Sequence, residues 1–172
     1  MKGNEPLNSV REVHYRALLP DDYLIFAALR QAALTGEPDA FGATWAQESQ
    51  RSPEEWRSFI SNRTIFAAFD GAEAVGIAAG GDRDARPNAR GLYSMWVHPS
   101  MRGTGVSTHL IMLVENWARE GGATFLALDV VTHLEYPRAL YRRCGFVETG
   151  RFSVMSRDPT ISLVEMDKDL RR

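Results

Sequence analysis

Apolar and polar residues follow two different rhythms along the chain. Where apolar residues alternate with polar ones or run together, the pattern predicts strands at 12–18, 64–69, 74–79, 91–98, 123–131, 146–156 and 160–166. Where apolar residues recur every three or four positions, it predicts helices at 21–36, from Ser52 onward, at 105–119 and at 137–143. Strands and helices in this order are typical of a layered α/β or α+β domain.

Short polar segments predict how these elements are connected. Asp70-Gly71 between two apolar runs is a hairpin signal, and Asp158-Pro159 divides the last two strands. Residues 80–88 are rich in Gly, Asp and Arg, which predicts an exposed turn. Ser52 is followed three residues later by Glu55, the pattern of a helix N-terminus in which each residue caps the other.

The strand predicted at 91–98 is apolar on both faces. Strict alternation divides it into a face of Tyr93, Met95 and Val97 and a face of Leu92, Ser94 and Trp96. A strand that is apolar on both faces is expected in the middle of a sheet.

Length and composition favour one ordinary globular domain. The chain has 172 residues, of which 44% are hydrophobic and 24% are charged. We expect a flexible tail at residues 1–10 and one domain at 11–172. The net charge of −2 provides no broad basic surface for nucleic acid or an anionic membrane.

Further function classes are excluded by the distribution of a few residue types. No apolar run is long enough for a membrane helix, and the first ten residues lack the apolar core of a signal peptide. Cys144 is the single cysteine, so no internal disulfide can form. The four histidines lie far apart without metal-ligand spacing, so no metal site is expected. We expect a cytoplasmic protein.

The segment with the clearest chemistry is Met95–Ser107, MWVHPSMRGTGVS. A buried strand ends at His98-Pro99, a turn with two glycines follows, and an amphipathic helix begins at once. Glycines leave backbone N–H groups accessible, and the first turn of a helix carries unpaired N–H groups and a partial positive charge. With Arg102 at its edge, this segment predicts a phosphate site; the alternative is a tight turn without a ligand.

Two other nucleotide motifs do not fit this segment. A P-loop requires a Gly-Lys-Ser/Thr ending, which is absent. The dinucleotide fingerprint requires a glycine at the position of Thr108.

The segment Arg102–Ser107 resembles the acyl-CoA signature of the GNAT N-acetyltransferase superfamily, Arg/Gln-x-x-Gly-x-Gly/Ala. It matches at Arg102 and Gly105 and departs at Ser107. Residues 139–146, with Leu-Tyr-x-x-x-Gly-Phe, and residues 39–42 resemble two further motifs of the family. The resemblance implies the GNAT fold, a mixed, twisted sheet of about seven strands with helices on both faces.

The resemblance also implies how acetyl-CoA is bound. The cosubstrate is expected between the strands at 91–98 and 123–131, with its pantetheine arm along Met95, Trp96 and Val97. Its pyrophosphate is expected on the segment Arg102, Gly103, Thr104, Gly105, Val106, Ser107 and Thr108. The family often has an asparagine where this chain has Leu134.

The implied reaction is direct attack of an amine on the thioester. A strand N–H near Met95–Val97 is expected to stabilise the oxyanion, and Tyr141 matches the tyrosine that protonates the departing thiolate. The predicted central strand has no carboxylate, so the general base is left open between Glu48, Asp129, His133 and water.

The sequence therefore predicts an acetyl-CoA-dependent N-acetyltransferase that needs no metal. The acceptor is expected to be a small amine or an amine of a peptide or protein. The resemblance implies that Phe41, Trp45 and the following helix form one wall of its pocket; the alternative is that these aromatic residues pack in the core. The alternatives are an acyltransferase that uses another acyl-CoA and a non-catalytic acyl-CoA-binding regulatory module. Both a monomer and a homodimer fit the sequence.

Overall fold

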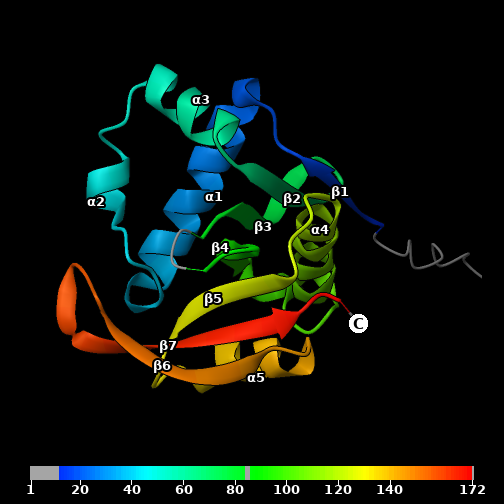
Figure 1. Ribbon diagram of the computed structural model, residues 1–172. Coiled ribbons are helices and arrows are strands. Elements are labelled where there is room, and N and C mark those ends of the chain that lie inside the picture. The colour runs from blue at the N-terminus through cyan, green and yellow to red at the C-terminus, as the bar shows by residue number, and fades with distance from the viewer. Residues whose placement is uncertain (1–11, 84–85, 172) are drawn as a thin grey trace, which may run out of the picture.

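The computed structural model describes residues 12–83 and 86–171. The tail expected at residues 1–10 lies outside the described residues. Seven strands form one sheet in the order β1-β2-β3-β4-β5-β7-β6 (Figure 1). The strands are β1 Val13–Ala17, β2 Thr64–Asp70, β3 Glu73–Asp82, β4 Ala89–Val97, β5 Phe125–Val131, β6 Val147–Met155 and β7 Asp158–Asp169.

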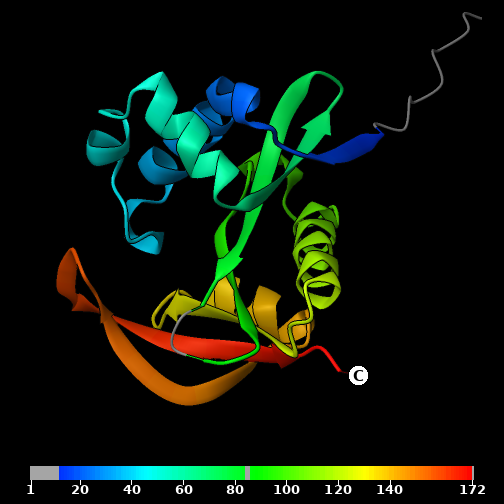
Figure 2. The same ribbon diagram turned by 45° about the horizontal axis from the view of Figure 1, so that its top comes forward.

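The sheet is mixed because one of its strand pairs is parallel. β4 runs parallel to β5, whereas the other neighbours are antiparallel. The parallel pairing is short, from Ala89↔Phe125 to Gly91↔Ala127, and the two strands then diverge (Figure 2). The sheet is thus split at its centre into a half of β1–β4 and a half of β5–β7.

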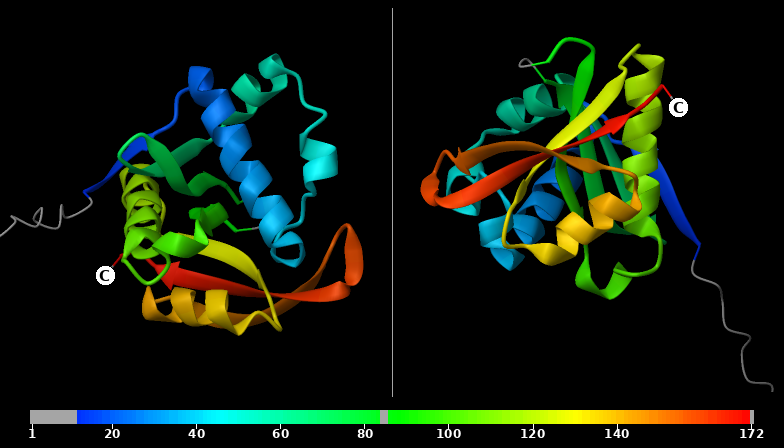
Figure 3. Two further views of the ribbon diagram at one scale, coloured as in Figure 1. Left: turned by 180° about the vertical axis from the view of Figure 1, so that it is seen from behind. Right: turned by 60° about the horizontal axis from the view of Figure 1, so that its bottom comes forward.

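Helices cover both faces of the sheet, as the sequence predicts. The helices are α1 Tyr23–Gly36, α2 Trp45–Glu48, α3 Pro53–Ser61, α4 Val106–Glu120 and α5 Glu135–Arg143, and the 3-10 turns are η1 Pro20–Asp22, η2 Pro38–Ala40 and η3 Pro99–Met101. One apolar core lies between the sheet and α1 and α3 and includes Phe26 and Ile60. The other lies between the sheet and α4 and α5 and includes Leu110 and Phe146 (Figure 3). No helix among the described residues combines the length and apolarity needed to cross a membrane.

Reciprocal side-chain caps begin two of the helices. At α3 the Ser52 hydroxyl accepts from the Glu55 N–H at 3.2 Å, and the Glu55 carboxylate accepts from the Ser52 N–H at 2.7 Å. This confirms the predicted cap. Thr44 and Gln47 cap the short helix α2 in the same way, and the sequence prediction had missed this helix.

Several predicted boundaries are wrong, and three of them have a clear physical or structural reason. Helix α5 begins at Glu135 and not at Pro137, because Pro137 occupies the third helical position, where an N–H has no intrahelical acceptor. Strand β3 continues through Gly80 to Asp82, within the segment predicted as a turn. The β6–β7 turn is at 156–157, and Pro159 lies inside β7 next to a register shift, where a missing N–H is tolerated.

Strand β4 contains a bulge that changes which side chains share a face. β3 pairs Ile77 with Trp96 but Ala79 with Tyr93, so β4 has one extra residue in between. Ser94 in this bulge has φ 52°, in the left-handed region. The alternation reverses there: Leu92 packs with Val97 in the core under α4, whereas Trp96, predicted on the same face as Leu92, packs in the core under α1. The predicted division of 91–98 into two strictly alternating faces is therefore wrong.

Candidate active site

A cleft of about 720 Å³ lies where β4 and β5 diverge. Its walls are Leu92–Val97 of β4 and Leu128–Val131 of β5. The last residue of α1, Gly36, and the segment 37–42 after it close one side, and residues of α5 close another. The cleft exists because the β4–β5 pairing stops at Gly91, while β5 continues its pairing with β7 as far as Val131.

The cleft brings together six of the site residues predicted from the sequence. They are Met95, Trp96, Val97, Arg102, Ser107 and Tyr141. The remaining predicted residues, Gly103, Thr104, Gly105, Val106 and Thr108, belong to the adjoining turn and first turn of α4 and are not part of the cleft wall. Leu134 also lines the cleft, where its aliphatic side chain offers no hydrogen bond.

The glycine turn and α4 form an accessible group of backbone donors. Gly103 and Gly105 have φ values of 77° and 93°, a conformation that side-chain-bearing residues rarely adopt. A Cβ at either position would meet no atom within 4 Å, so the space above the turn is open. The N–H groups of Val106–Thr108 begin α4 and have no acceptor within the helix. The geometry suits an anion.

Arg102 connects this turn to the cleft. Its Nε donates to the carbonyl oxygen of Val97 at 3.1 Å, and its Nη2 lies 2.8 Å from Oε1 of Glu37. The side chain is 28% exposed. The guanidinium therefore lies at the edge of the cleft, held by the end of β4 and by the segment after α1.

Tyr141 is suited to donate a proton in the cleft. The residue is only 8% exposed, and its ring packs edge-on against Phe146. No hydrogen bond joins its hydroxyl to any other residue that the structure describes, so the donor is free for a ligand. Burial raises the pKa of Tyr141, with a smaller contribution from Cys144, so the phenol is protonated at neutral pH.

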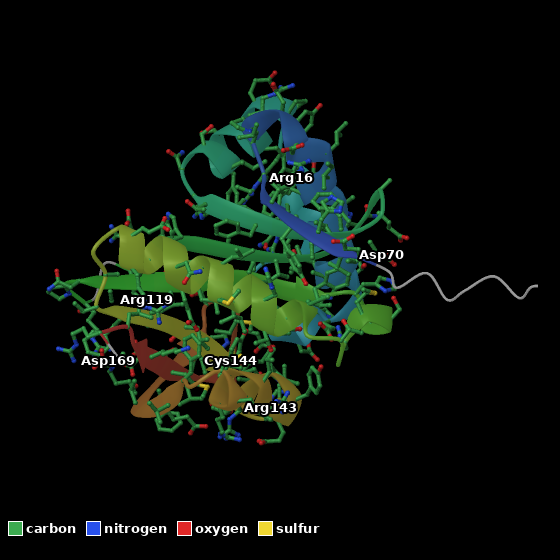
Figure 4. All side chains as sticks on the ribbon, turned by 90° about the vertical axis from the view of Figure 1, so that its right-hand side faces the viewer. Arg16, Asp70, Arg119, Arg143, Cys144 and Asp169 are labelled. Carbon is green, nitrogen blue, oxygen red and sulfur yellow. The ribbon has the colours of Figure 1, made fainter. Side chains whose placement is uncertain are left out.

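Cys144 is not activated as a nucleophile. It lies at the end of α5, below α4 (Figure 4). Burial raises the pKa of its thiol, whereas a nucleophilic cysteine requires a lowered pKa.

The three side chains considered as general base lie in different environments. Glu48 is only 5% exposed and lies outside the cleft wall, with both carboxylate oxygens paired to Arg30. Asp129 lines the cleft, but its two oxygens accept from Arg83 at 2.9 and 3.0 Å. His133 lines the cleft and is exposed, without an ion pair to any described residue.

Several aromatic side chains line the cleft. Phe41 and two exposed residues, Tyr93 and Tyr136, line it, whereas Trp45 packs into the core under α1 and does not. Sequence analysis missed Tyr136 because the predicted helix began after it. The tip of the β6–β7 hairpin reaches toward η2 (Figure 3), where Arg157 donates to the carbonyl oxygen of Phe41 at 3.1 Å.

Comparisons with known proteins show the family of the chain. The model of the Acetyltransferase (GNAT) family matches residues 28–146. An aminoglycoside N(6')-acetyltransferase type 1 from Stenotrophomonas maltophilia is 37% identical over 60 residues, which are 35% of this chain and 39% of that protein. An IAA acetyltransferase from Azospirillum brasilense is 32% identical over 71 residues, 41% of this chain and 46% of that protein. The matches thus span less than half the length of these relatives.

Solved structures of low sequence identity share the fold. An N-acetyltransferase from Staphylococcus aureus superposes with a TM-score of 0.75 at 17% identity, over 93% of this chain and 99% of that one. A protein from Salmonella typhimurium, solved with its cofactor acetyl-CoA, gives a TM-score of 0.76 at 15% identity, over 94% of this chain and 95% of that one.

Proposed function

Because the chain belongs to the acetyltransferase (GNAT) family, we propose that it transfers the acetyl group of acetyl-CoA to a primary amine. The observation that carries this proposal is the cleft between β4 and β5, which has backbone donors at one end and a buried, protonated tyrosine in its wall. A pocket of this kind suits a long ligand with phosphate groups toward one end and a reactive group at the other.

The residues present fit acetyl-CoA. The open turn at Gly103 and Gly105 and the N–H groups that begin α4 are suited to the pyrophosphate, with Arg102 adding a positive charge. From Leu92 onward, β4 has no partner on β5, so its backbone can pair with the amides of the pantetheine arm. When bound, acetyl-CoA supplies the activated acyl group.

Three features of the chain would promote the transfer. Backbone N–H groups of Met95–Val97 stabilise the negative charge that develops on the thioester oxygen. Tyr141 donates its proton to the departing thiolate. His133 accepts the proton of the amine, because Glu48 and Asp129 are engaged by arginines and His133 is not.

The acceptor enters, in this proposal, beside the aromatic side chains of the cleft. The relatives named above make an aminoglycoside amine one class to test, beside aliphatic amines and the α-amino group of a peptide. An acceptor in this position would contact Phe41 and Tyr136 while its nitrogen reaches the thioester.

The first test is thermal unfolding with acetyl-CoA, with ATP and NADPH as controls. Acetyl-CoA at about 100 times its Kd should add about 2.7 kcal/mol of stability. For a chain of this size the midpoint should rise by roughly 5–10 °C. No shift in the folded protein would overturn the cosubstrate assignment.

The second test is a panel of amines with detection of the released thiol. Turnover of one class would support the transferase and identify its acceptor. A thermal shift with acetyl-CoA but no turnover of any amine would favour the non-catalytic binding module. A larger shift with another acyl-CoA would favour that acyl donor instead.

A further inference from the structure

A buried ion pair next to the cleft has no part in the mechanism above. Arg30 of α1 and Glu48 of α2 are each only 5% exposed. Nε and Nη2 of Arg30 donate to the two carboxylate oxygens of Glu48 at 2.9 and 2.8 Å. Arg51 lies further from the same carboxylate, at 3.9 Å. Both oxygens of Glu48 are thus used to orient the guanidinium of Arg30.

The remaining nitrogen of Arg30 reaches the central strand. Its Nη1 donates to the hydroxyl of Ser94 at 3.3 Å, across 64 positions of sequence. The guanidinium also lies over the ring of Phe41, 5.5 Å from its centre. Ser94 and Phe41 both line the cleft, so one buried cation contacts two of its walls.

The backbone conformation of Ser94 has to be stabilised by surrounding contacts. It has φ 52° without being glycine, and it lies in the bulge of β4. An L-residue with a Cβ is strained in this region, so surrounding contacts must hold it there. Ser94 and Met95 have no registered partner on β3, and the pairing of β4 with β5 ends at Gly91. The two residues therefore lie outside both ladders, next to the expected position of the thioester.

Global stability alone does not account for a buried pair of this kind. Removing two charges from water costs about as much as their attraction returns, and apolar replacements of both partners are often tolerated. A fixed, forked guanidinium, by contrast, can define the position of a distant group. Here the defined group is the hydroxyl of Ser94.

We propose that Arg30 and Glu48 are positioning residues for acyl transfer, which hold the Ser94 bulge of β4 so that backbone donors of this segment face the thioester oxygen. This inference rests on the proposed function. Glu48 orients Arg30, and Arg30 holds Ser94; neither residue touches the reacting atoms. The pair affects the step in which the oxyanion develops and not the binding of the CoA moiety.

The double variant Arg30→Met/Glu48→Leu tests this by removing both charges of the buried pair together; the partly exposed Arg51 then loses only its longer contact of 3.9 Å to Glu48. We expect a folded protein with an unchanged thermal shift by acetyl-CoA. With the amine that gives turnover in the panel, kcat should fall by about 10- to 100-fold, less than the loss of a whole oxyanion donor. The KM for acetyl-CoA should stay within about twofold. Arg30→Lys should lower kcat similarly, because one ammonium group cannot reproduce the two hydrogen bonds to Glu48 together with the hydrogen bond to Ser94.

Rescue by glycine separates positioning from packing. Glycine adopts a positive φ without strain, so Ser94→Gly added to the double variant should restore most of kcat. Ser94→Ala added instead keeps the strain and should restore nothing. The matched control is Lys168→Met/Glu115→Leu, which removes another largely buried ion pair between α4 and β7, at 2.7 Å, and should leave kcat unchanged.

A spectroscopic measurement keeps this inference separate from the proposed function. The carbonyl stretch of bound acetyl-CoA labelled with ¹³C at the thioester should move to lower frequency in the wild type. It should return toward the solution value in Arg30→Met/Glu48→Leu. Wild-type kcat and frequency in that folded variant would overturn the positioning role and leave the transferase intact. A frequency change without turnover of any amine would retain the positioning of the bulge but overturn the proposed function.

Discussion

Replacing Tyr141 by phenylalanine removes only the hydroxyl oxygen, so it tests the proposed proton donation while the packing of the ring is kept. The ring remains against Phe146, and the hydroxyl has no hydrogen bond to any described residue. Its removal should therefore change the free energy of unfolding by less than about 1 kcal/mol. A general acid contributes about 10²- to 10⁴-fold to rate. Since a thiolate is a good leaving group, with a thiol pKa near 8.5, we expect the lower end, a fall in kcat of about 100-fold.

The assay is steady-state release of thiol from acetyl-CoA with a saturating amine, together with thermal unfolding. Tyr15→Phe is the matched control, because Tyr15 is a partly buried tyrosine on β1, outside the cleft wall. A kcat for Tyr141→Phe within about threefold of wild type would refute the acid role. A large loss of stability with little change in kcat would indicate that the hydroxyl is structural.

The raised pKa of Tyr141 makes a second, independent prediction for the same variant. The folded state retains the phenolic proton at a pH where the unfolded chain, with an ordinary tyrosine pKa of about 10, loses it. The unfolded state then binds fewer protons, so stability falls as the pH rises above 10. The fall attributable to Tyr141 is at most about 1.4 kcal/mol per pH unit. Urea unfolding between pH 9 and 11 should show a smaller fall for Tyr141→Phe than for wild type; parallel falls would contradict the prediction.

Three further substitutions test the remaining parts of the site and fold. Arg102→Gln should raise the Kd for acetyl-CoA by about tenfold and reduce its salt dependence, measured by calorimetry, since Arg102 is partly exposed and Glu37 competes for it; an unchanged Kd would remove Arg102 from the phosphate site. His133→Gln should lower kcat/KM by about 100-fold, because a general base contributes about 10²- to 10⁴-fold to rate, and an unchanged kcat/KM would assign the proton to water. Gly80→Ala should lower the free energy of unfolding in urea by about 1–3 kcal/mol, because its methyl would overlap the ring of Trp117; wild-type stability would show that the ring moves aside.

Much of the fold could be predicted because its signals are local. Each element is determined by its caps, its glycine turns and its apolar spacing, and these involve residues only a few positions apart, as at Ser52 and Glu55. The glycine turn before α4 was predicted for the same reason. The β4 bulge could not be predicted in this way. The bulge depends on a mismatch of one residue between β3 and β4. Its positive-φ position is Ser94, and no glycine there signals it in the sequence.

The candidate bases show a limit of a different kind. Glu48 and Asp129 are equally plausible from the sequence, because a carboxylate near a predicted site is available unless something binds it. The residues that bind them lie far away along the chain: Arg30 is 18 positions from Glu48, and Arg83 is 46 positions from Asp129. Each of these carboxylates has both oxygens accepting from an arginine, so neither oxygen is directed at an amine in the cleft. In the proposed function these two pairings leave His133 or water to accept the proton of the amine. Glu48 does not use Nη1 of Arg30, which donates to Ser94 on the strand where we propose that the transfer takes place.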